Sequence, residues 1–84
     1  MSKAQSAIIE IDIHGQTKYQ AMTIIDNQLR KAGSGIYRIR IIHGFHGGTE
    51  LKDMIRSTYS NHVKVIRIES GFNEGITELV LRNF

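Results

Sequence analysis

The triplet Ile-His-Gly occurs twice, as Ile13-His14-Gly15 and as Ile42-His43-Gly44. Asp12 precedes the first histidine by two positions, so on an extended strand its side chain leaves the same face as that of His14. A carboxylate beside an imidazole can fix the tautomer of the ring and raise its basicity, which prepares it to take or give a proton near neutral pH. His43 could supply the second member of an acid–base pair. We therefore predict Asp12, His14 and His43 as catalytic residues.

The second histidine opens a glycine-rich segment, Gly44-Phe45-His46-Gly47-Gly48-Thr49. Glycines allow a sharp turn and a close approach of a ligand, and the N–H groups of such a loop can surround a phosphate. The spacing is neither that of a Walker loop nor that of a dinucleotide-binding loop. Two alternatives stay open. The segment could be a simple entry into a helix, and the two histidines could merely bond to loop backbone at the strand ends.

The predicted nucleic-acid contacts combine this loop with the first corner and two cations. Phe45 could stack on a base or anchor the loop, and the cations could contact phosphates or remain solvated surface charges. The predicted set is Gly15, Arg40, Gly44, Phe45, His46, Gly47, Gly48 and Lys52.

Periodic hydrophobic patterns predict the elements that position these residues. Apolar residues alternate with polar ones in four segments, which predicts strands over 7–13, 37–41, 63–68 and 77–81. Thr17 with Gln20 matches a capping box at the start of a first helix, and Gly33 could end it. Thr49 could cap a second helix. The order is β-α-β-α-β-β.

This order predicts a two-layer α/β (α+β) sandwich. The first two strands are parallel, because a helix connects them, so their carboxyl ends meet at one edge of the sheet. Both helix N-termini point to that edge, where their free N–H groups suit an anion. However, His43 has the parity of Ile41, whereas His14 has the parity of Asp12. The two rings can converge only where the chain leaves strand regularity at the glycines.

Charged residues occupy every second position in three of the four predicted strands, which indicates that one sheet face is open to solvent. Strands buried on both faces would be continuously apolar. We therefore expect both helices on one face of a four-stranded mixed sheet. Opposite charges are expected to pair across the other face, among Glu10, Asp12, Arg38 and Arg40.

Length and composition set further limits. The 84 residues suffice for one domain, 1–84, with a core over about 7–82. The sequence has no cysteine, which excludes disulfides and thiolate metal sites and makes the cytoplasm the expected compartment. No apolar run reaches the roughly 20 residues that would cross a membrane, so no membrane partner is expected. A net charge of +3 permits a phosphate-bearing partner without proving one, and the oligomeric state is undetermined.

Taken together, these motifs resemble the Smr (small MutS-related) domain family from about Ile8 to Leu81. The family signature Asp-Leu-His-Gly is present as Asp12-Ile13-His14-Gly15. The second signature, His-Gly-x-Gly-x-Gly before a Leu-Arg/Lys helix, corresponds to residues 43–52, with Phe45 where lysine is common and with one extra residue. No MutS ATPase or clamp region is present, so any link to DNA repair rests on the family name.

The resemblance implies a fold like the C-terminal domain of a bacterial translation initiation factor and an endonuclease acting on DNA or RNA. It implies functions for Asp12, His14 and the His43-Gly44 corner. No cofactor is required. Asp12 and a histidine could hold a divalent ion, but they would make a weak magnesium site because they supply a single carboxylate. The altered second motif favours a module that binds DNA or structured (ribosomal) RNA without cutting it. A protein-interaction domain is the third hypothesis.

Overall fold

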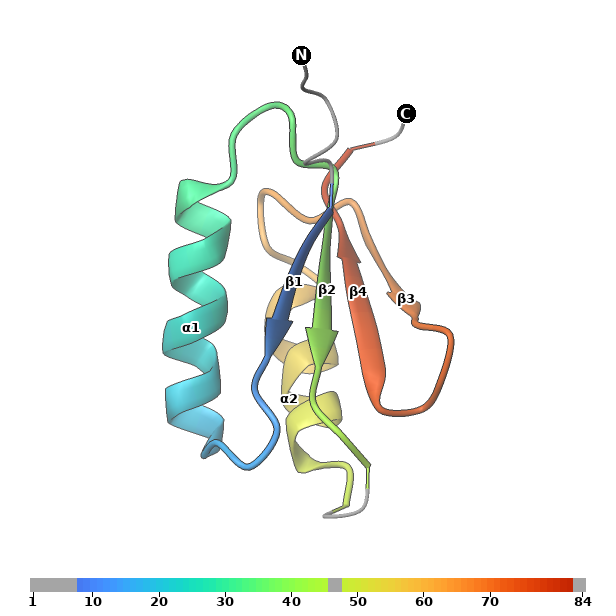
Figure 1. Ribbon diagram of the computed structural model, residues 1–84. Helices are drawn as coiled ribbons and strands as arrows, with labels where there is room; N and C mark the ends of the chain where they lie inside the picture. Colours follow the sequence, from blue (N-terminus) through green and yellow to red (C-terminus); the bar gives the residue numbers. More distant parts are fainter. Residues whose placement is uncertain (1–7, 46–47, 83–84) are drawn as a thin grey trace.

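The computed structural model describes residues 8–45 and 48–82. Its elements are β1 (Ile8–Asp12), α1 (Lys18–Lys31), β2 (Arg38–Ile42), α2 (Glu50–Tyr59), β3 (Arg67–Ser70) and β4 (Ile76–Val80) (Figure 1). The sheet order is β1-β2-β4-β3, with β1 parallel to β2 and with β4 antiparallel to both of its neighbours. The predicted two-layer α+β architecture is confirmed. No helix within the described ranges is long and apolar enough to span a membrane.

The hydrophobic core lies between the sheet and the two helices. Ile39 and Ile41 of β2 are completely buried on the face that the helices cover, and Ile25 and Leu29 of α1 are buried against them. Each such side chain contributes about 1.5–3 kcal/mol when it leaves water. The core cluster comprises Ile13, Ala21, Ile25, Leu29, Ile39, Ile41, Met54, Ile55, Tyr59, Val65 and Leu79.

Element ends differ from the predicted ones where local hydrogen bonds intervene. The strand predicted over 63–68 begins only at Arg67, because the N–H of Val65 donates to the carbonyl of His62 and holds a turn. Helix α1 ends at Lys31 rather than at Gly33, because the N–H of Ala32 closes its last turn on Gln28 and Leu29. Each end of the other three strands differs from its predicted position by one residue.

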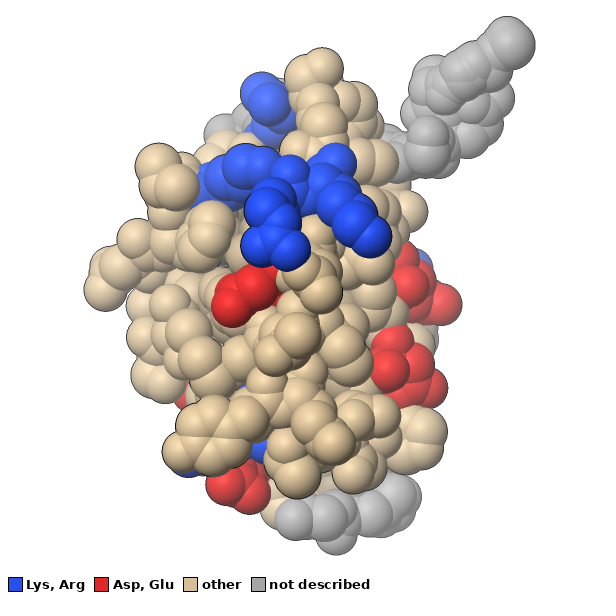
Figure 2. Space-filling model, turned by 90° about the vertical axis from the view of Figure 1, so that its left-hand side faces the viewer, with Lys and Arg blue, Asp and Glu red and all other residues tan. Residues whose placement is uncertain are grey.

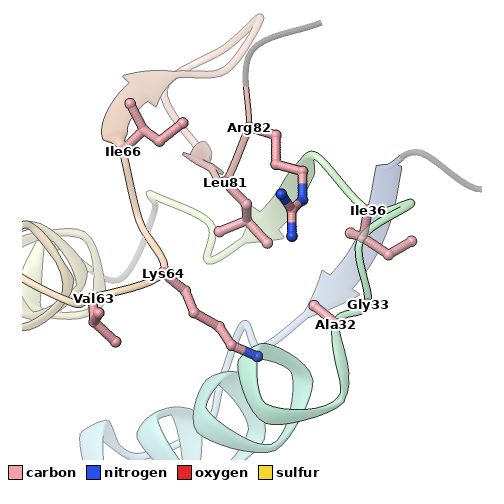
Figure 3. Close-up of a pocket in the computed structure, with 8 residues that line it drawn as sticks. All are labelled: Ala32, Gly33, Ile36, Val63, Lys64, Ile66, Leu81 and Arg82. Carbon is pink, nitrogen blue, oxygen red and sulfur yellow. The ribbon is translucent and has the colours of Figure 1, made fainter.

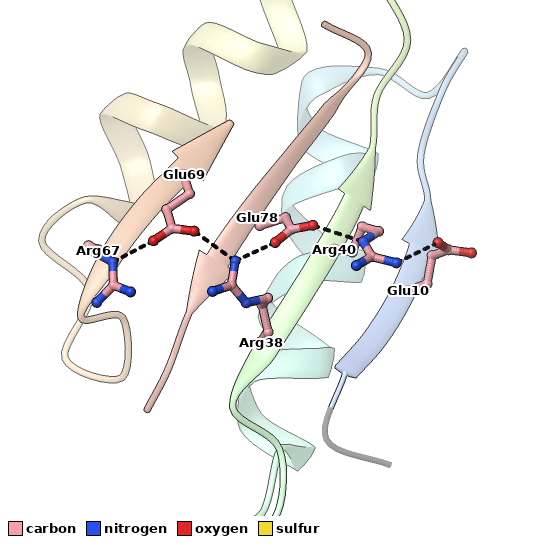
Figure 4. A network of polar contacts seen from close by, with 6 residues as sticks. All are labelled: Glu10, Arg38, Arg40, Arg67, Glu69 and Glu78. Carbon is pink, nitrogen blue, oxygen red and sulfur yellow. Dashed lines mark hydrogen bonds and ion pairs between the residues drawn. The ribbon is translucent and has the colours of Figure 1, made fainter. Parts of the chain in front are cut away.

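Ion pairs link all four strands across the open face of the sheet (Figure 4). Arg40 lies 3.6 Å from Glu10 of β1 and 2.8 Å from Glu78 of β4. Arg38 bonds Glu78 and, at 2.8 Å, Glu69 of β3, and Arg67 adds a contact to Glu69. The predicted pairing of Glu10 with Arg40 is confirmed, whereas Asp12 lies outside this network.

Two carboxylates stand directly opposite each other in this network. Glu69 and Glu78 are register partners on β3 and β4, an arrangement that is unfavourable for like charges. Arg38 bonds both of them. Hydrogen bonds from Arg38 and then Arg67 lower the pKa of Glu69. Burial raises the pKa of Glu78, but hydrogen bonds from Arg40 and Arg38 outweigh it and the net shift is downward. Arg38 is therefore the cation that makes this cross-strand pair tolerable.

The two helices begin differently. At α1, the Thr17 hydroxyl accepts from the N–H of Gln20 at 3.1 Å and the Gln20 side chain accepts from the N–H of Thr17 at 2.9 Å, so the predicted capping box is present. At α2, Thr49 makes no capping bond, because its hydroxyl donates to the Asp53 carboxylate at 2.9 Å. Thr49 therefore holds the expected N-cap position, but no side-chain capping bond is present there.

This difference predicts unequal costs for two threonine substitutions. We expect Thr17→Ala to lower the free energy of unfolding by about 1 kcal/mol, because a capping bond is lost. Thr49→Ala removes no capping bond and should cost less than about half of that. Urea denaturation of both variants measures the difference, and equal losses would contradict the assignment of the two helix starts.

Candidate functional site

The two histidine corners lie side by side at the carboxyl ends of β1 and β2, at the lower edge of the sheet in Figure 1. A Cβ placed on Gly44 would lie 3.6 Å from the Cβ of His14. Positive φ angles of 79° at Gly15 and 75° at Gly44 turn the chain here, in a region that favours glycine. A pocket of about 470 Å³ opens between the corners; it is lined by His14, Gly15, Gln16, Ile42, His43, Gly44, Phe45, Gly48, Glu50 and Leu51.

Asp12 and His14 form the tightest polar contact of this edge. The Asp12 Oδ1 lies 2.6 Å from the His14 Nδ1 and also accepts from the His14 N–H at 3.0 Å. The hydrogen bond from the His14 side chain, with that from its backbone, lowers the pKa of Asp12. Asp12 is therefore ionised at neutral pH and holds the ring with Nδ1 toward it. The His14 side chain is 70% exposed, so the other ring nitrogen is accessible from solvent.

His43 is in a different environment. It is 5% exposed, on the helix-covered side that its parity with Ile41 predicts. Its Nδ1 lies 2.7 Å from the carbonyl oxygen of Gly44, which can only accept, so Nδ1 carries the proton. Its Nε2 lies 2.8 Å from the Thr77 hydroxyl and accepts from it. Burial, supported by the positive charges of Lys52 and Arg56, lowers the pKa of His43 despite the opposing bond to Gly44.

The structure thus brings the two corners together, but the two imidazoles lie in different environments. The His14 ring is exposed and has one nitrogen engaged, whereas the His43 ring is buried and has both engaged. A catalytic function of His43 remains a prediction, and this geometry gives it a structural function instead: it holds the Gly44 peptide.

Two residues of β4 and its preceding turn support this corner and were not predicted. The carbonyl of Gly75 accepts from the N–H groups of His43 and Gly44, at 2.9 and 3.0 Å. A Cβ at Gly75 would come within 3.3 Å of both Phe45 and Gly44, so the turn and the loop are in close contact. Thr77, completely buried, supplies the hydroxyl for His43. The sequence did contain a signal for this contact: Thr77 places a hydroxyl at a core position of β4, and a buried hydroxyl needs a hydrogen-bond partner.

The remaining predicted contacts fall into three groups. Phe45 and Gly48 line the pocket, whereas His46 and Gly47 lie outside the described residues. Arg40 lies in the ion-pair network of the open face, and its guanidinium also stacks 5.6 Å from the Phe72 ring centre. Lys52 lines a separate pocket beside the β3–β4 turn. The two predicted cationic contacts therefore lie away from His14.

The residues around this pocket carry less positive charge than the sequence predicted. Among the described residues that line it, Glu50 carries the one permanent charge, and its nearest cation is Lys18 at 4.0 Å. In Figure 2, charged side chains are sparse in the lower part of the view, and the cations gather at the opposite end. Positive potential at the pocket comes from the start of α2, whose first N–H groups belong to Glu50 and Leu51, and from Lys52 and Arg56, whose charges act on His43.

Metal ligands are scarce in the described part of the chain. No group of three His, Cys, Asp or Glu side chains there could hold a metal ion. Asp12 and His14 are the pair closest to such a site, and they bond each other. A divalent ion held by the Asp12 Oδ1 and the His14 Nδ1 would have to replace that bond.

Fold and site together define a two-layer α+β domain with an Asp-x-His-Gly corner beside a His-Gly loop. Residues 11–77 match the Smr domain family, and the chain belongs to that family. The Smr domain of Thermus thermophilus MutS2 is similar in structure, with a TM-score of 0.79 and 26% sequence identity over 89% of this chain and 99% of that one. No curated protein matches the chain significantly. The Smr family is associated with nucleic-acid binding and nuclease activity.

The buried environment of His43 predicts a pH dependence. Because burial disfavours its charged form, His43 should titrate below its ordinary value of about 6.5. The unfolded chain then takes up this proton first as the pH falls, so the free energy of unfolding should decrease as the pH drops from about 6.5 toward 5. NMR titration of the His43 ring, with urea denaturation across this range, measures both effects. A His43 pKa at or above about 6.5 would contradict the assignment.

Proposed function

We propose that this Smr domain cleaves phosphodiester bonds of nucleic acid at the edge formed by His14 and Gly44, with His14 as the proton-transfer group. The observation that carries the proposal is the 2.6 Å contact between the Asp12 carboxylate and the His14 Nδ1 on an exposed ring. An oriented imidazole of this kind, beside an anion-compatible helix start, is the arrangement that general acid–base catalysis at a phosphate requires.

The hydrogen-bond geometry decides which atom transfers the proton. With Nδ1–H donating to Asp12, the lone pair of His14 lies on Nε2, for which residues 8–45 and 48–82 supply no hydrogen-bond partner. Nε2 can therefore remove a proton from the attacking hydroxyl. The ionised Asp12 stabilises the imidazolium that results, and it keeps the reactive nitrogen directed away from the protein.

RNA is the substrate that demands least from this site. Its own 2′-oxygen can form the new bond to phosphorus while the bond between phosphorus and the 5′-oxygen breaks. His14 takes the proton of the 2′-hydroxyl, and the 5′-oxygen receives one from water. The products are a 2′,3′-cyclic phosphate and a 5′-hydroxyl. DNA has no 2′-hydroxyl and would need a positioned water as the nucleophile.

The remaining groups of the edge hold the substrate. The uncapped N–H groups at the start of α2 lie at the pocket and can donate to phosphate oxygens. The Phe45 ring, 49% exposed, stands at the pocket mouth where a base could stack on it. His43 acts as a positioning residue: it fixes the Gly44 peptide through Nδ1 and is fixed in turn by Thr77.

A second candidate function is nucleic-acid binding without cleavage. The buried state of His43 favours it, because the site then has one imidazole for proton transfer instead of two. Phe45 favours it as well, since it occupies a pocket position where a lysine would add a phosphate contact. In this case the Asp12–His14 pair would bind phosphate and shape the loop.

Substitution of the Asp12–His14 pair tests the proposed activity. We expect His14→Gln to reduce cleavage of single-stranded RNA about a hundredfold or more, because the proton-transfer group is lost. Asp12→Asn should reduce it by about tenfold or more, because the imidazolium loses its counter-charge. The measurement is cleavage of end-labelled RNA, with and without chelator, together with identification of the new ends.

Glu10→Gln is the matched control, because Glu10 lies on the same strand and face as Asp12 and does not touch His14. It should keep the wild-type rate. Equal cleavage by wild type and the Asp12→Ala/His14→Ala double variant would refute the proposed site. Salt-dependent RNA binding without any product would select the binding-only function.

Glu50 provides an independent test of the phosphate position. Its carboxylate lies at the pocket and repels a phosphate that binds at the start of α2. We expect Glu50→Gln to tighten RNA binding about two- to fivefold at low salt, a modest gain because the side chain is exposed. Fluorescence anisotropy measures the change. Glu10→Gln, which removes one carboxylate on β1 outside the lining of this pocket, is the control and should change the affinity less. Unchanged or weaker binding by Glu50→Gln would move the phosphate elsewhere.

A further inference from the structure

Four exposed cations gather at the end of the molecule opposite to the His14 edge. Arg30 and Lys31 end α1, and the Lys64 ammonium lies 2.6 Å from the Leu29 carbonyl in the same turn. Arg82 lines, with Lys64, a pocket next to them. Figure 2 shows this concentration at the top of the view, over the last turn of α1. We call Arg30, Lys31, Lys64 and Arg82 the distal basic patch.

The distal basic patch accounts for the positive charge of the whole chain. The sequence has eleven Lys and Arg against eight Asp and Glu. Outside the patch, seven Lys and Arg remain, one fewer than the acidic residues. The rest of the chain is thus close to neutral, and its arginines on the open face are bonded to glutamates. A polyanion approaching this domain is attracted to the distal end first.

An apolar pocket of about 270 Å³ lies within the patch (Figure 3). Arg82 and Lys64 reach toward it from two different segments, while Ile36 and Leu81 form part of its lining. Val63, which is 94% exposed, stands at its rim. Fold stability explains part of the charge, because cations favour the C-terminus of a helix and Lys64 caps α1. It does not explain Arg82, which lies beyond β4, or an apolar hollow between cations.

We infer that the distal basic patch is a second contact surface for the sugar-phosphate backbone of the nucleic-acid substrate, separate from the His14 edge. This inference rests on the proposed function for its class of ligand. Charge complementarity selects a phosphodiester chain, and the pocket offers an apolar surface to a sugar or a base between two phosphate contacts. The patch would supply the cations that the pocket at the His14 edge lacks.

The length of α1 sets the reach of such a strand. Its 14 residues separate the two ends of the domain by about 20 Å, since a helix rises about 1.5 Å per residue. At the axial rise of about 3.4 Å per nucleotide of a helically stacked strand, this distance corresponds to about six nucleotides. Strands longer than that touch both surfaces, whereas a dinucleotide at the His14 edge cannot reach the patch.

Arg82→Gln and Arg67→Gln form a matched pair for the test. Each removes one arginine and lowers the net charge by one, but Arg67 lies on β3 in the open-face network. The probe is a fluorescein-labelled 2′-O-methyl oligonucleotide of about twelve residues, which cannot be cleaved through its 2′-oxygen, titrated between about 50 and 200 mM salt. We expect Arg82→Gln to weaken binding severalfold and to reduce the salt slope by about 0.7, and Lys31→Gln/Arg82→Gln by about twice that. Arg67→Gln should retain the wild-type slope.

A second measurement separates the patch from the catalytic edge. Arg82→Gln should raise KM for long RNA with kcat unchanged and should leave dinucleotide cleavage at the wild-type rate. Equal slopes for Arg82→Gln and Arg67→Gln would overturn the inference, while loss of cleavage in His14→Gln would still support the proposed function. Binding to phosphatidylserine vesicles that Arg82→Gln abolishes, with no binding of the oligonucleotide, would assign the patch to lipid and overturn it as well.

Discussion

The alternation of side chains along β2 is the constraint on which the site depends. Ile39, Ile41 and His43 share the side that the helices cover, so a histidine at this position must enter the core and must find partners there. Thr77 and the Gly44 carbonyl are those partners. As a result, both ring nitrogens of this histidine are hydrogen-bonded, and burial favours its neutral form. The Asp12–His14 corner, which follows the opposite parity on β1, is left exposed for chemistry.

The same constraint explains how much of the fold the sequence could reveal. Charges at alternate positions of the strands correctly indicated the sheet face that carries the ion pairs, although every residue of β4 is buried, and Thr17 with Gln20 correctly indicated the start of α1. Thr49 has the same residue type as Thr17, but Asp53 competes for its hydroxyl. Such a choice between two local hydrogen bonds depends on side-chain geometry, so sequence patterns alone do not resolve it.

For the site, the sequence identified the residues but not their environments. The parity of His43 already indicated that its ring could leave the side of His14, and the structure places it in the core. The support from Gly75 could not be foreseen, because it depends on how the β3–β4 turn packs on the loop. Likewise, the distal basic patch joins residues from three separate parts of the chain, so its existence follows from the sheet order and not from any local charge run.

The position of Arg38 between two glutamates has a consequence for the order of folding. Glu69 and Glu78 face each other across β3 and β4, and the cation that neutralises them belongs to β2. A β3–β4 hairpin formed on its own would keep Arg67 beside Glu69 but would leave Glu78 without Arg38 and Arg40, which disfavours it as an early, independent unit. β3 is also an edge strand of four residues. We therefore expect the parallel β1–β2 pair and β4 to assemble first. The edge strand β3 would then add to β4 once Arg38 of β2 is in place.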